Sequence, residues 1–330
     1  MDKPFLLYDT KFKKNYMAYG SYKGLISLLK LRLGLRNVAD KFLLSVQYLL
    51  KINSSLDKRS AGIFSDIVAC FEHKIEAAIL YNTSWYKETM YIGYIQTSEK
   101  LFFIKVYRNQ QEALFQKHQS DFIEKFFAKD FNLVPVTQHY NNILVYNYVS
   151  LTKQSDEAKI IFEKIIRLNQ EFVKTAKIDK MVSDILPSDI YFVFDQWNRD
   201  LSLKIKSWVL AHKTRVPVIP CHGDMTPWNI AVKKNGEVFL FDYEQAGWHT
   251  PFYDYFHYLV QPAALKNEKL IYKNLNIHIG HENTDIFLIL YLIDQLYQAA
   301  DKLRNGYQDK HFLTMVRNKA ILLSELLDKS

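Results

Sequence analysis

The sequence predicts an α+β fold in two lobes, a small antiparallel β lobe followed by a mainly helical lobe, with a basic helical extension at the N-terminus. The hydrophobic share of 48% argues against disorder over most of the chain. Gly at 10 and Pro at 8 among 330 residues are sparse, which favours long helices over a turn-rich sandwich. Strand-like runs cluster before residue 150 and helical periodicity dominates after it. These patterns predict boundaries at 1–74, 75–150 and 151–330.

The extension carries almost all of the excess positive charge. The whole chain has a net charge of +8, and residues 1–75 hold 13 Lys and Arg against 6 Asp and Glu, a difference of +7. Between residues 21 and 55, apolar residues recur at helical spacing with basic residues between them, which predicts a pair of amphipathic helices packed on a domain. The alternative is a basic helix that lies on an anionic membrane surface. No nucleic-acid partner is expected, because the remainder of the chain is nearly neutral.

The expected setting is cytoplasmic. Only Cys70 and Cys221 are present, which is neither a disulfide framework nor a metal-ligand pattern. The first residues, "MDKPFLLYDTKFKKNY", contain no apolar run followed by a small-residue cleavage site. The longest apolar run, residues 286–293, is far shorter than the roughly 20 residues of a membrane span.

The β lobe is predicted from a change in the residue pattern at residue 75. Apolar, β-branched and aromatic runs between residues 75 and 107 indicate three strands joined by polar turns. Residues 109–130 show helical spacing of Phe and Ile, and residues 134–150 indicate two strands around an Asn-Asn turn.

The second lobe is predicted to be helical with one interruption. Residues 155–177 begin with a Ser-Asp-Glu cap and keep a 3.6-residue period, and residues 192–213 are predicted as another helix. Strands interrupt between residues 216 and 247, and residues 253–330 are mainly helical.

The interruption contains the residues that indicate chemistry. In "CHGDMTPWNI", Asp224 precedes Asn229 by five residues. A short strand follows at 230–232, Asn-Gly at 235–236 is a strong hairpin-turn signal, and a return strand ends just before Asp242. Because a hairpin brings its two ends together, the sequence predicts that Asp224, Asn229 and Asp242 cluster at one end of it.

Such a cluster suits phosphoryl transfer from a nucleotide. Mg²⁺ prefers oxygen ligands and usually takes one or two from the protein, which Asn229 and Asp242 can provide. A carboxylate not bound to metal, Asp224, can orient an attacking hydroxyl and accept its proton. Protein kinases use the same order, with an Asp, an Asn five residues later and a metal-binding Asp after a hairpin.

The same chemistry asks for a lysine on the third strand of the sheet. Lys105 lies in "LFFIKVY" with apolar neighbours on both sides, where an ammonium is costly unless it meets anionic partners. A nucleotide phosphate and a carboxylate from a helix would be suitable anionic partners for Lys105. The following helix offers Glu112, Asp121 and Glu124, and the sequence does not choose between Glu112 and Glu124.

These segments resemble a known superfamily. "HGDMTPWN" followed by "FLFDYEQAG" looks like the aminoglycoside phosphotransferase and choline kinase superfamily, the small-molecule kinases with a protein-kinase-like fold. "FDYEQAGWHTPFYDYFHYL" is similar to the choline and ethanolamine kinase segment that carries Asp-x-Glu and a later Asp. The motif match covers residues 218–259, the match over 77–150 is thinner, and residues 1–74 do not match.

The resemblance implies a role for each matching position. It makes Asp224 the catalytic base, Asn229 and Asp242 the Mg²⁺ ligands, and Lys105 the lysine that binds the ATP phosphates. Residues 146–149 become the interlobe hinge that meets the adenine, with Tyr146, Asn147 and Tyr148 as contacts. The loop after the first strand lacks the glycines of many kinases, so phosphates there would meet Asn82, Thr83 or Ser84.

Further residues near the motif carry two interpretations each. His222 is either a base or a structural histidine that bonds within the loop, and the structural role is the one expected. Trp228 is a packing residue or a wall of the acceptor pocket, and Glu244 is a solvated charge or an acceptor contact. Asp254 is a helix cap and loop anchor or a substrate ligand. The aromatic residues around Asp254 are expected to be core rather than a cation cage: Tyr253, Tyr255, Phe256 and Tyr258.

The predicted function is phosphorylation of a small-molecule hydroxyl with ATP and Mg²⁺. Choline, ethanolamine, an aminoglycoside, a free sugar and a sugar on a surface-polysaccharide intermediate remain candidate acceptors, and the Asp242-x-Glu244 resemblance tilts toward amino alcohols. The alternative is a kinase-like module that binds nucleotide or a partner without turnover and docks through its basic N-terminus. The sequence indicates no oligomeric state.

Overall fold

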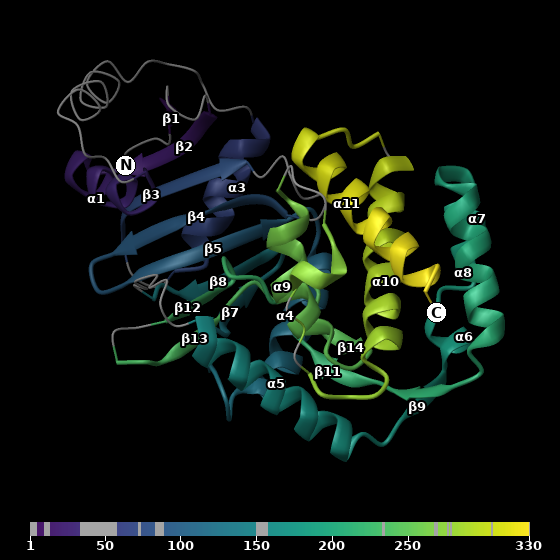
Figure 1. Ribbon diagram of the computed structural model, residues 1–330. Helices are drawn as coiled ribbons and strands as arrows, with labels where there is room; N and C mark the ends of the chain where they lie inside the picture. The colour runs from purple at the N-terminus through teal and green to yellow at the C-terminus, as the bar shows by residue number, and fades with distance from the viewer. Residues whose placement is uncertain are drawn as a thin grey trace. The chain divides into compact units, whose positions relative to one another are not determined.

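The computed structural model describes residues 5–9, 14–33, 58–71, 74–82, 89–149, 158–232, 235–266, 270–275, 277, 279–304 and 306–329. The chain divides into two compact units (Figure 1). The first consists of Met1–Asp121 and Val134–Ser150, and the second of Phe122–Leu133 and Leu151–Ser330. The predicted α+β class, with an antiparallel sheet first and a helical part second, is confirmed.

The first unit is built on a seven-stranded antiparallel sheet in the order β1-β2-β3-β4-β5-β8-β7. All five predicted strands are present, and the Asn-Asn turn between the last two contains Asn141 with a positive φ of 49°, a conformation that asparagine tolerates. The strands span Phe5–Asp9 (β1), Lys14–Gly20 (β2), Ile75–Asn82 (β3), Thr89–Thr97 (β4), Leu101–Tyr107 (β5), Val136–Tyr140 (β7) and Ile143–Asn147 (β8).

Helices cover both faces of this sheet (Figure 1). Because successive strand residues point to opposite faces, Ile104 and Val106 of β5 pack toward helix α3 (Lys58–Ala69), and Lys105 points to the other face. On that other face, α1 (Tyr22–Leu33) covers β2 and β3. Helix α4 (Gln110–Phe127) begins there, with Ala113 packed on Tyr107, Leu144 and Tyr146.

The structure corrects the helical description of residues 1–74. Two strands, β1 and β2, lie in this segment, and β2 pairs with β3 from Tyr16 opposite Tyr81 to Gly20 opposite Ala77. The described part of the segment therefore extends the sheet and packs on it through α1 and α3. The apolar side of α1 is buried on the sheet through Leu25, Leu28 and Leu29, as the packing interpretation predicts. Residues 34–57, the remainder of the predicted helix pair, lie outside the described residues.

The second unit is mainly helical around one large apolar core. Short strands form three small sheets, β10-β9, β11-β14 and β12-β13-β6. The helices are α5 (Ala158–Thr175), α6 (Val182–Ile185), α7 (Ile190–Trp197), α8 (Arg199–Ala211), α9 (Tyr253–Ala264), α10 (Thr284–Arg304) and α11 (Lys310–Leu327), with a 3-10 turn at Tyr272–Leu275. The strands are β6 (Asn132–Leu133), β9 (Asp179–Met181), β10 (Arg215–Pro217), β11 (Ile219–Cys221), β12 (Ile230–Val232), β13 (Val238–Leu240) and β14 (Gly247–His249).

The single helix predicted over residues 192–213 is two helices. Asn198 separates α7 from α8, and its side-chain Oδ1 accepts a hydrogen bond from Leu201 N at 3.1 Å. Asparagine is a preferred N-cap because its side chain satisfies an amide at the start of a helix. Among the helices in the described ranges, none is both long and apolar enough to cross a membrane.

Candidate active site

The segment with the predicted cluster is a loop between two short strands of the second unit. β11 ends at Cys221 and β12 begins at Ile230. Gly223 has a positive φ of 81°, and a Cβ there would lie 2.0 Å from the carbonyl oxygen of Gln245. Only glycine fits such a close approach of two backbone segments. The local backbone therefore requires glycine at position 223, between His222 and Asp224.

Asp254 holds the start of this loop. Its Oδ2 accepts a hydrogen bond from His222 N at 2.8 Å, and its Oδ1 accepts one from Gly223 N at 2.9 Å. The Asp254 side chain lies in the first turn of α9 and is 1% exposed. Burial raises its pKa to about 7, in opposition to the two backbone hydrogen bonds. This geometry favours the loop-anchor interpretation of Asp254 over a substrate ligand.

Asp224 and Asn229 are in direct contact. Asn229 Nδ2 donates to the backbone oxygen of Asp224 and to its carboxylate Oδ2, each at 2.9 Å. The loop between them is closed by Thr226 N on Asp224 O and by Asn229 N on Thr226 O, both at 3.0 Å. Because the amide nitrogen of Asn229 is turned to Asp224, its carbonyl oxygen Oδ1 is left as the atom that can serve a metal ion.

The predicted hairpin is confirmed and brings Asp242 beside this pair. Strands β12 and β13 pair from Ile230 opposite Leu240 to Val232 opposite Val238. The pairing continues past the strand ends, because Phe241 N donates to Asn229 O at 3.2 Å. Asp242 follows directly, is half-buried, and has a positive φ of 70°. Its carboxylate raises the pKa of His222, which places the two side chains within electrostatic reach.

The electrostatic environment keeps Asp224 ionised and His222 neutral. Burial raises the pKa of Asp224, but the hydrogen bond and charge attraction of His257, the attraction of His222 and the hydrogen bond from Asn229 together outweigh it, and the pKa lies below the usual value. Burial lowers the pKa of His222 to about 4 despite the attraction of Asp224 and Asp242. His222 is fully buried, and its Nδ1 accepts a hydrogen bond from Asp224 N at 3.3 Å. His222 thus bonds within the loop, as predicted.

The structure adds a residue that the sequence reasoning missed. His257 Nε2 lies 2.8 Å from Asp224 Oδ1, and His257 Nδ1 lies 3.2 Å from the Tyr291 hydroxyl. His257 follows Asp254 by three residues on α9, so both face the same loop. That spacing is the signal that could have found it. The neighbouring aromatic residues of α9 are core, as predicted, with exposures of 7% or less.

A buried lysine lies behind His257. Lys319 of α11 is 1% exposed, and its Nζ donates to Gln261 Oε1 at 2.6 Å and to Gln295 Oε1 at 2.7 Å. The Nζ also lies 5.7 Å from the centre of the Tyr291 ring. Burial lowers the pKa of Lys319 to about 7, against the attraction of Asp224 and Asp294.

Stability is expected to rise with pH between about pH 7 and about pH 8.5 because of Lys319. Over this range the unfolded chain holds a proton on residue 319 that the folded protein releases, so the free energy of unfolding increases by about 1.5 kcal/mol. Chemical denaturation at both pH values should show this rise, and Lys319→Met should remove it. Lys310→Met, an exposed position on the same helix, is the control and should keep it. An equal rise in Lys319→Met would contradict the assignment.

The residues predicted to bind nucleotide lie in the first unit, apart from Glu124. Lys105 is half-buried in the middle of β5, between Ile92 of β4 and Leu144 of β8. Glu112 is engaged in a capping box: its Oε2 accepts from Arg108 N at 3.1 Å, and Glu112 N donates to Asn109 Oδ1 at 2.9 Å. Glu124 is exposed on the part of α4 that belongs to the second unit. The role of either acid toward Lys105 stays a prediction.

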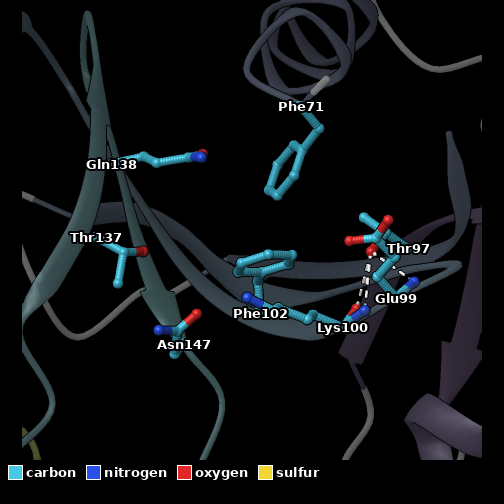
Figure 2. Close-up of a pocket in the computed structure, with 8 residues that line it drawn as sticks. All are labelled: Phe71, Thr97, Glu99, Lys100, Phe102, Thr137, Gln138 and Asn147. Atoms are coloured by element: carbon cyan, nitrogen blue, oxygen red, sulfur yellow. Dashed lines mark hydrogen bonds between the residues drawn. The ribbon is translucent and has the colours of Figure 1, made fainter. Parts of the chain in front are cut away.

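The predicted hinge residues alternate between the two faces of the sheet. Tyr146 lies across from Phe103, with ring centres 6.0 Å apart, on the Lys105 face. Asn147 lies on the opposite face, in a cavity of about 260 Å³ (Figure 2). The Tyr148 amide donates to Leu101 O at 3.0 Å. The cavity is lined by Phe71, Thr97, Glu99, Lys100, Phe102, Thr137, Gln138 and Asn147.

The remaining predicted residues are described only in part. Asn82 ends β3, while Thr83 and Ser84 lie outside the described residues. Trp228 is 40% exposed, which disfavours a packing role and leaves the pocket-wall interpretation. Glu244 is half-buried beside the hairpin end.

The residues of the loop and hairpin fit a Mg²⁺ ion. Asn229 Oδ1 and the Asp242 carboxylate are hard oxygen donors at neighbouring positions of the hairpin end, and Mg²⁺ commonly takes two such ligands and completes its shell with phosphate oxygens and water. Asp224 is not one of these two ligands. Its carboxylate is held by hydrogen bonds from His257 and Asn229 and can accept a proton.

Comparison with known proteins agrees with this geometry. The model of a phosphotransferase enzyme family, APH, matches residues 184–272, which include the loop, the hairpin and all of α9. The predicted resemblance to this family is confirmed over the matched residues, and the match supports the predicted enzyme class. The comparisons thus support a phosphotransferase that acts on a hydroxyl group. No curated protein sequence matches this chain at a significant level.

Solved structures share its fold at low sequence identity. Choline kinase LicA from Streptococcus pneumoniae is 14% identical, with 83% of this chain and 100% of that chain covered and a TM-score of 0.54. A macrolide 2'-phosphotransferase type I is 9% identical, with 82% and 99% covered and a TM-score of 0.54. Amicoumacin kinase hAmiN, in complex with AMP-PNP, Ca²⁺ and Ami, is 13% identical, with 83% and 94% covered and a TM-score of 0.50.

Proposed function

We propose that the protein transfers the γ-phosphoryl group of ATP to a hydroxyl group of a small molecule, with Asp224 as catalytic base and Asn229 and Asp242 as Mg²⁺ ligands. The observation that supports this most is the hairpin end, where Phe241 bonds to Asn229 and Asp242 follows, beside the Asp224 carboxylate that Asn229 contacts. Protein kinases use the same set of side chains, in the same order, for phosphoryl transfer.

In the proposed reaction, Asp224 accepts a hydrogen bond from the acceptor hydroxyl and takes its proton. The hydroxyl oxygen forms a new bond to the γ-phosphorus, and the bond between that phosphorus and the β,γ-bridging oxygen breaks, so ADP leaves with the electron pair. Asp224 suits this role because it is ionised and 24% exposed. Its proton is then released to solvent. Most of the rate gain comes from positioning and charge stabilisation.

The remaining nucleotide contacts are part of the proposal. Mg²⁺, when bound, would neutralise charge on the phosphates. Lys105 would bind the phosphates, with Glu112 or Glu124 as its partner, and the backbone of residues 146–149 would meet the adenine. Asn82, Thr83 and Ser84 would meet phosphates from the preceding loop. The complex of amicoumacin kinase with AMP-PNP and Ca²⁺ supports a nucleotide and a divalent ion for this fold.

The acceptor is proposed to be an amino alcohol, an aminoglycoside or a sugar. Tyr253 and Tyr258 are buried, so they do not form an exposed cage for a quaternary ammonium group. Half-buried Asp294 accepts hydrogen bonds from the Tyr253 hydroxyl at 2.6 Å and from Gln298 Nε2 at 2.9 Å. Glu244 and Trp228 are the residues proposed to contact the acceptor. Contact of the basic N-terminus with an anionic membrane stays a prediction.

A panel of acceptors tests the proposal. The protein is incubated with MgATP and choline, ethanolamine, an aminoglycoside or free sugars, and ADP release and phosphorylated product are measured. We expect at least one class to give product that depends on the acceptor and on Mg²⁺. If the protein binds nucleotide but transfers phosphate neither to any acceptor nor to water, the alternative function is favoured, a kinase-like module that binds nucleotide without turnover.

A further inference from the structure

Two hydrogen bonds hold the Asp224 carboxylate, one on each oxygen. His257 Nε2 lies 2.8 Å from Oδ1, and Asn229 Nδ2 lies 2.9 Å from Oδ2. The torsion that rotates a carboxylate about its Cβ–Cγ bond is broad, so a single donor leaves the plane of the group loosely defined. Donors on both oxygens fix that plane. Each oxygen still has a lone pair for the acceptor hydroxyl, and the side chain is 24% exposed.

His257 is itself held in one tautomer. An ionised carboxylate only accepts hydrogen bonds, so Nε2 must carry the proton that is donated to Asp224. The Tyr291 hydroxyl lies 3.2 Å from Nδ1 and supplies the matching donor. Burial raises the pKa of Tyr291 well above its usual value, so this hydroxyl keeps its proton.

Burial, together with two neighbouring basic groups, disfavours a positive charge on the His257 ring. His257 is 3% exposed. Burial lowers its pKa, the Asp224 carboxylate raises it, and Lys319 and His249 lower it further. From its own helix, Tyr253 lies parallel to it with ring centres 6.3 Å apart. From the loop, His222 also faces this cluster; it is neutral, and His257 is one of the groups that lower its pKa.

We propose that His257 is a positioning residue that fixes the orientation of the Asp224 carboxylate through its Nε2–H group, and that Tyr291 fixes the tautomer of His257. This rests on the proposed function, because it assigns the effect of His257 to the carboxylate that accepts the hydroxyl proton. His257 does not contact substrate. Its loss therefore lowers the rate of the chemical step and leaves nucleotide binding unchanged.

The kinetic test compares three variants with MgATP, using water as acceptor and the best acceptor of the panel. His257→Leu is expected to lower kcat about 10-fold to 100-fold, the range for residues that orient metal-binding side chains through a hydrogen bond, with KM for ATP unchanged. His257→Gln keeps an amide N–H near the position of Nε2 and is expected to recover most of that loss. His311→Leu, an exposed histidine on α11, is the control and should match the wild type.

A second readout needs no turnover. Imidazole ¹⁵N chemical shifts of the wild-type protein should show His257 as the neutral Nε2–H tautomer, and Tyr291→Phe should lower the population of that tautomer. An Nδ1–H or charged His257 in the wild type would overturn the proposal even if His257→Leu fails to fold. So would wild-type kcat in folded His257→Leu. Absence of transfer in the wild type, with the Nε2–H tautomer present, would overturn the proposed function instead.

Discussion

Replacing Asp224 by Asn should lower the turnover of ATP by about 10²-fold to 10⁴-fold, the typical contribution of a general base. The amide is nearly the same size as the carboxylate but cannot accept the hydroxyl proton. It also reverses one hydrogen bond, because an NH₂ group must face either Asn229 Nδ2 or His257 Nε2–H, which are both donors. The effect should appear in kcat, since the proposed nucleotide contacts do not include Asp224.

The measurement for this variant is steady-state kinetics with the acceptor that the panel identifies. Asp195→Asn, an exposed aspartate on α7, is the matched control and should keep wild-type kcat. Thermal unfolding should show that Asp224→Asn is folded. If the folded variant kept the wild-type rate, Asp224 would not be the base.

The second large effect concerns stability. Asp254→Ala should lower the free energy of unfolding by about 2 to 4 kcal/mol, because it leaves the buried amides of His222 and Gly223 without their acceptor. The loss of the buried carboxylate offsets part of this cost, since burial already raises the pKa of Asp254 to about 7. The loop that carries Asp224 would lose its anchor, so kcat should also fall.

Chemical denaturation compares this variant with Asp195→Ala. The control position is exposed, and its substitution should change the free energy of unfolding by less than about 0.5 kcal/mol. Equal stability of Asp254→Ala and the control would show that the two loop amides do not depend on Asp254.

Local signals explain why the hairpin and its end were predictable. The Asn235-Gly236 turn sets the register by itself, and Gly236 has the expected positive φ of 81°. The break between α7 and α8 at Asn198 also has a local signal, because asparagine is a preferred N-cap residue. The sequence reasoning missed it because apolar residues continue at helical spacing on both sides of Asn198. The five strands between residues 75 and 150 were also found, because each run is bounded by turn residues.

Tertiary contacts decided the features that sequence reasoning missed. Strand β2 pairs with β3, and β1 pairs with β2. Because strand propensity depends strongly on the neighbouring strand, these two strands could not be predicted from their own residues. The helical spacing of apolar residues between positions 21 and 55 suggested a helical extension instead. The contact between His257 and Asp224 joins residues 33 positions apart, and it exists because Asp254, one helical turn earlier, binds the loop.

The central claim is that Asn229 and Asp242 hold one divalent ion beside a carboxylate that is not a ligand. A crystal structure of the protein with Mn²⁺ in place of Mg²⁺ and a non-hydrolysable ATP analogue tests this directly through the anomalous signal of the metal. We predict a metal at roughly 2.0–2.3 Å from Asn229 Oδ1 and from an Asp242 carboxylate oxygen, with Asp224 outside its coordination shell. A metal bound elsewhere, or bound without Asn229 and Asp242, would contradict the account.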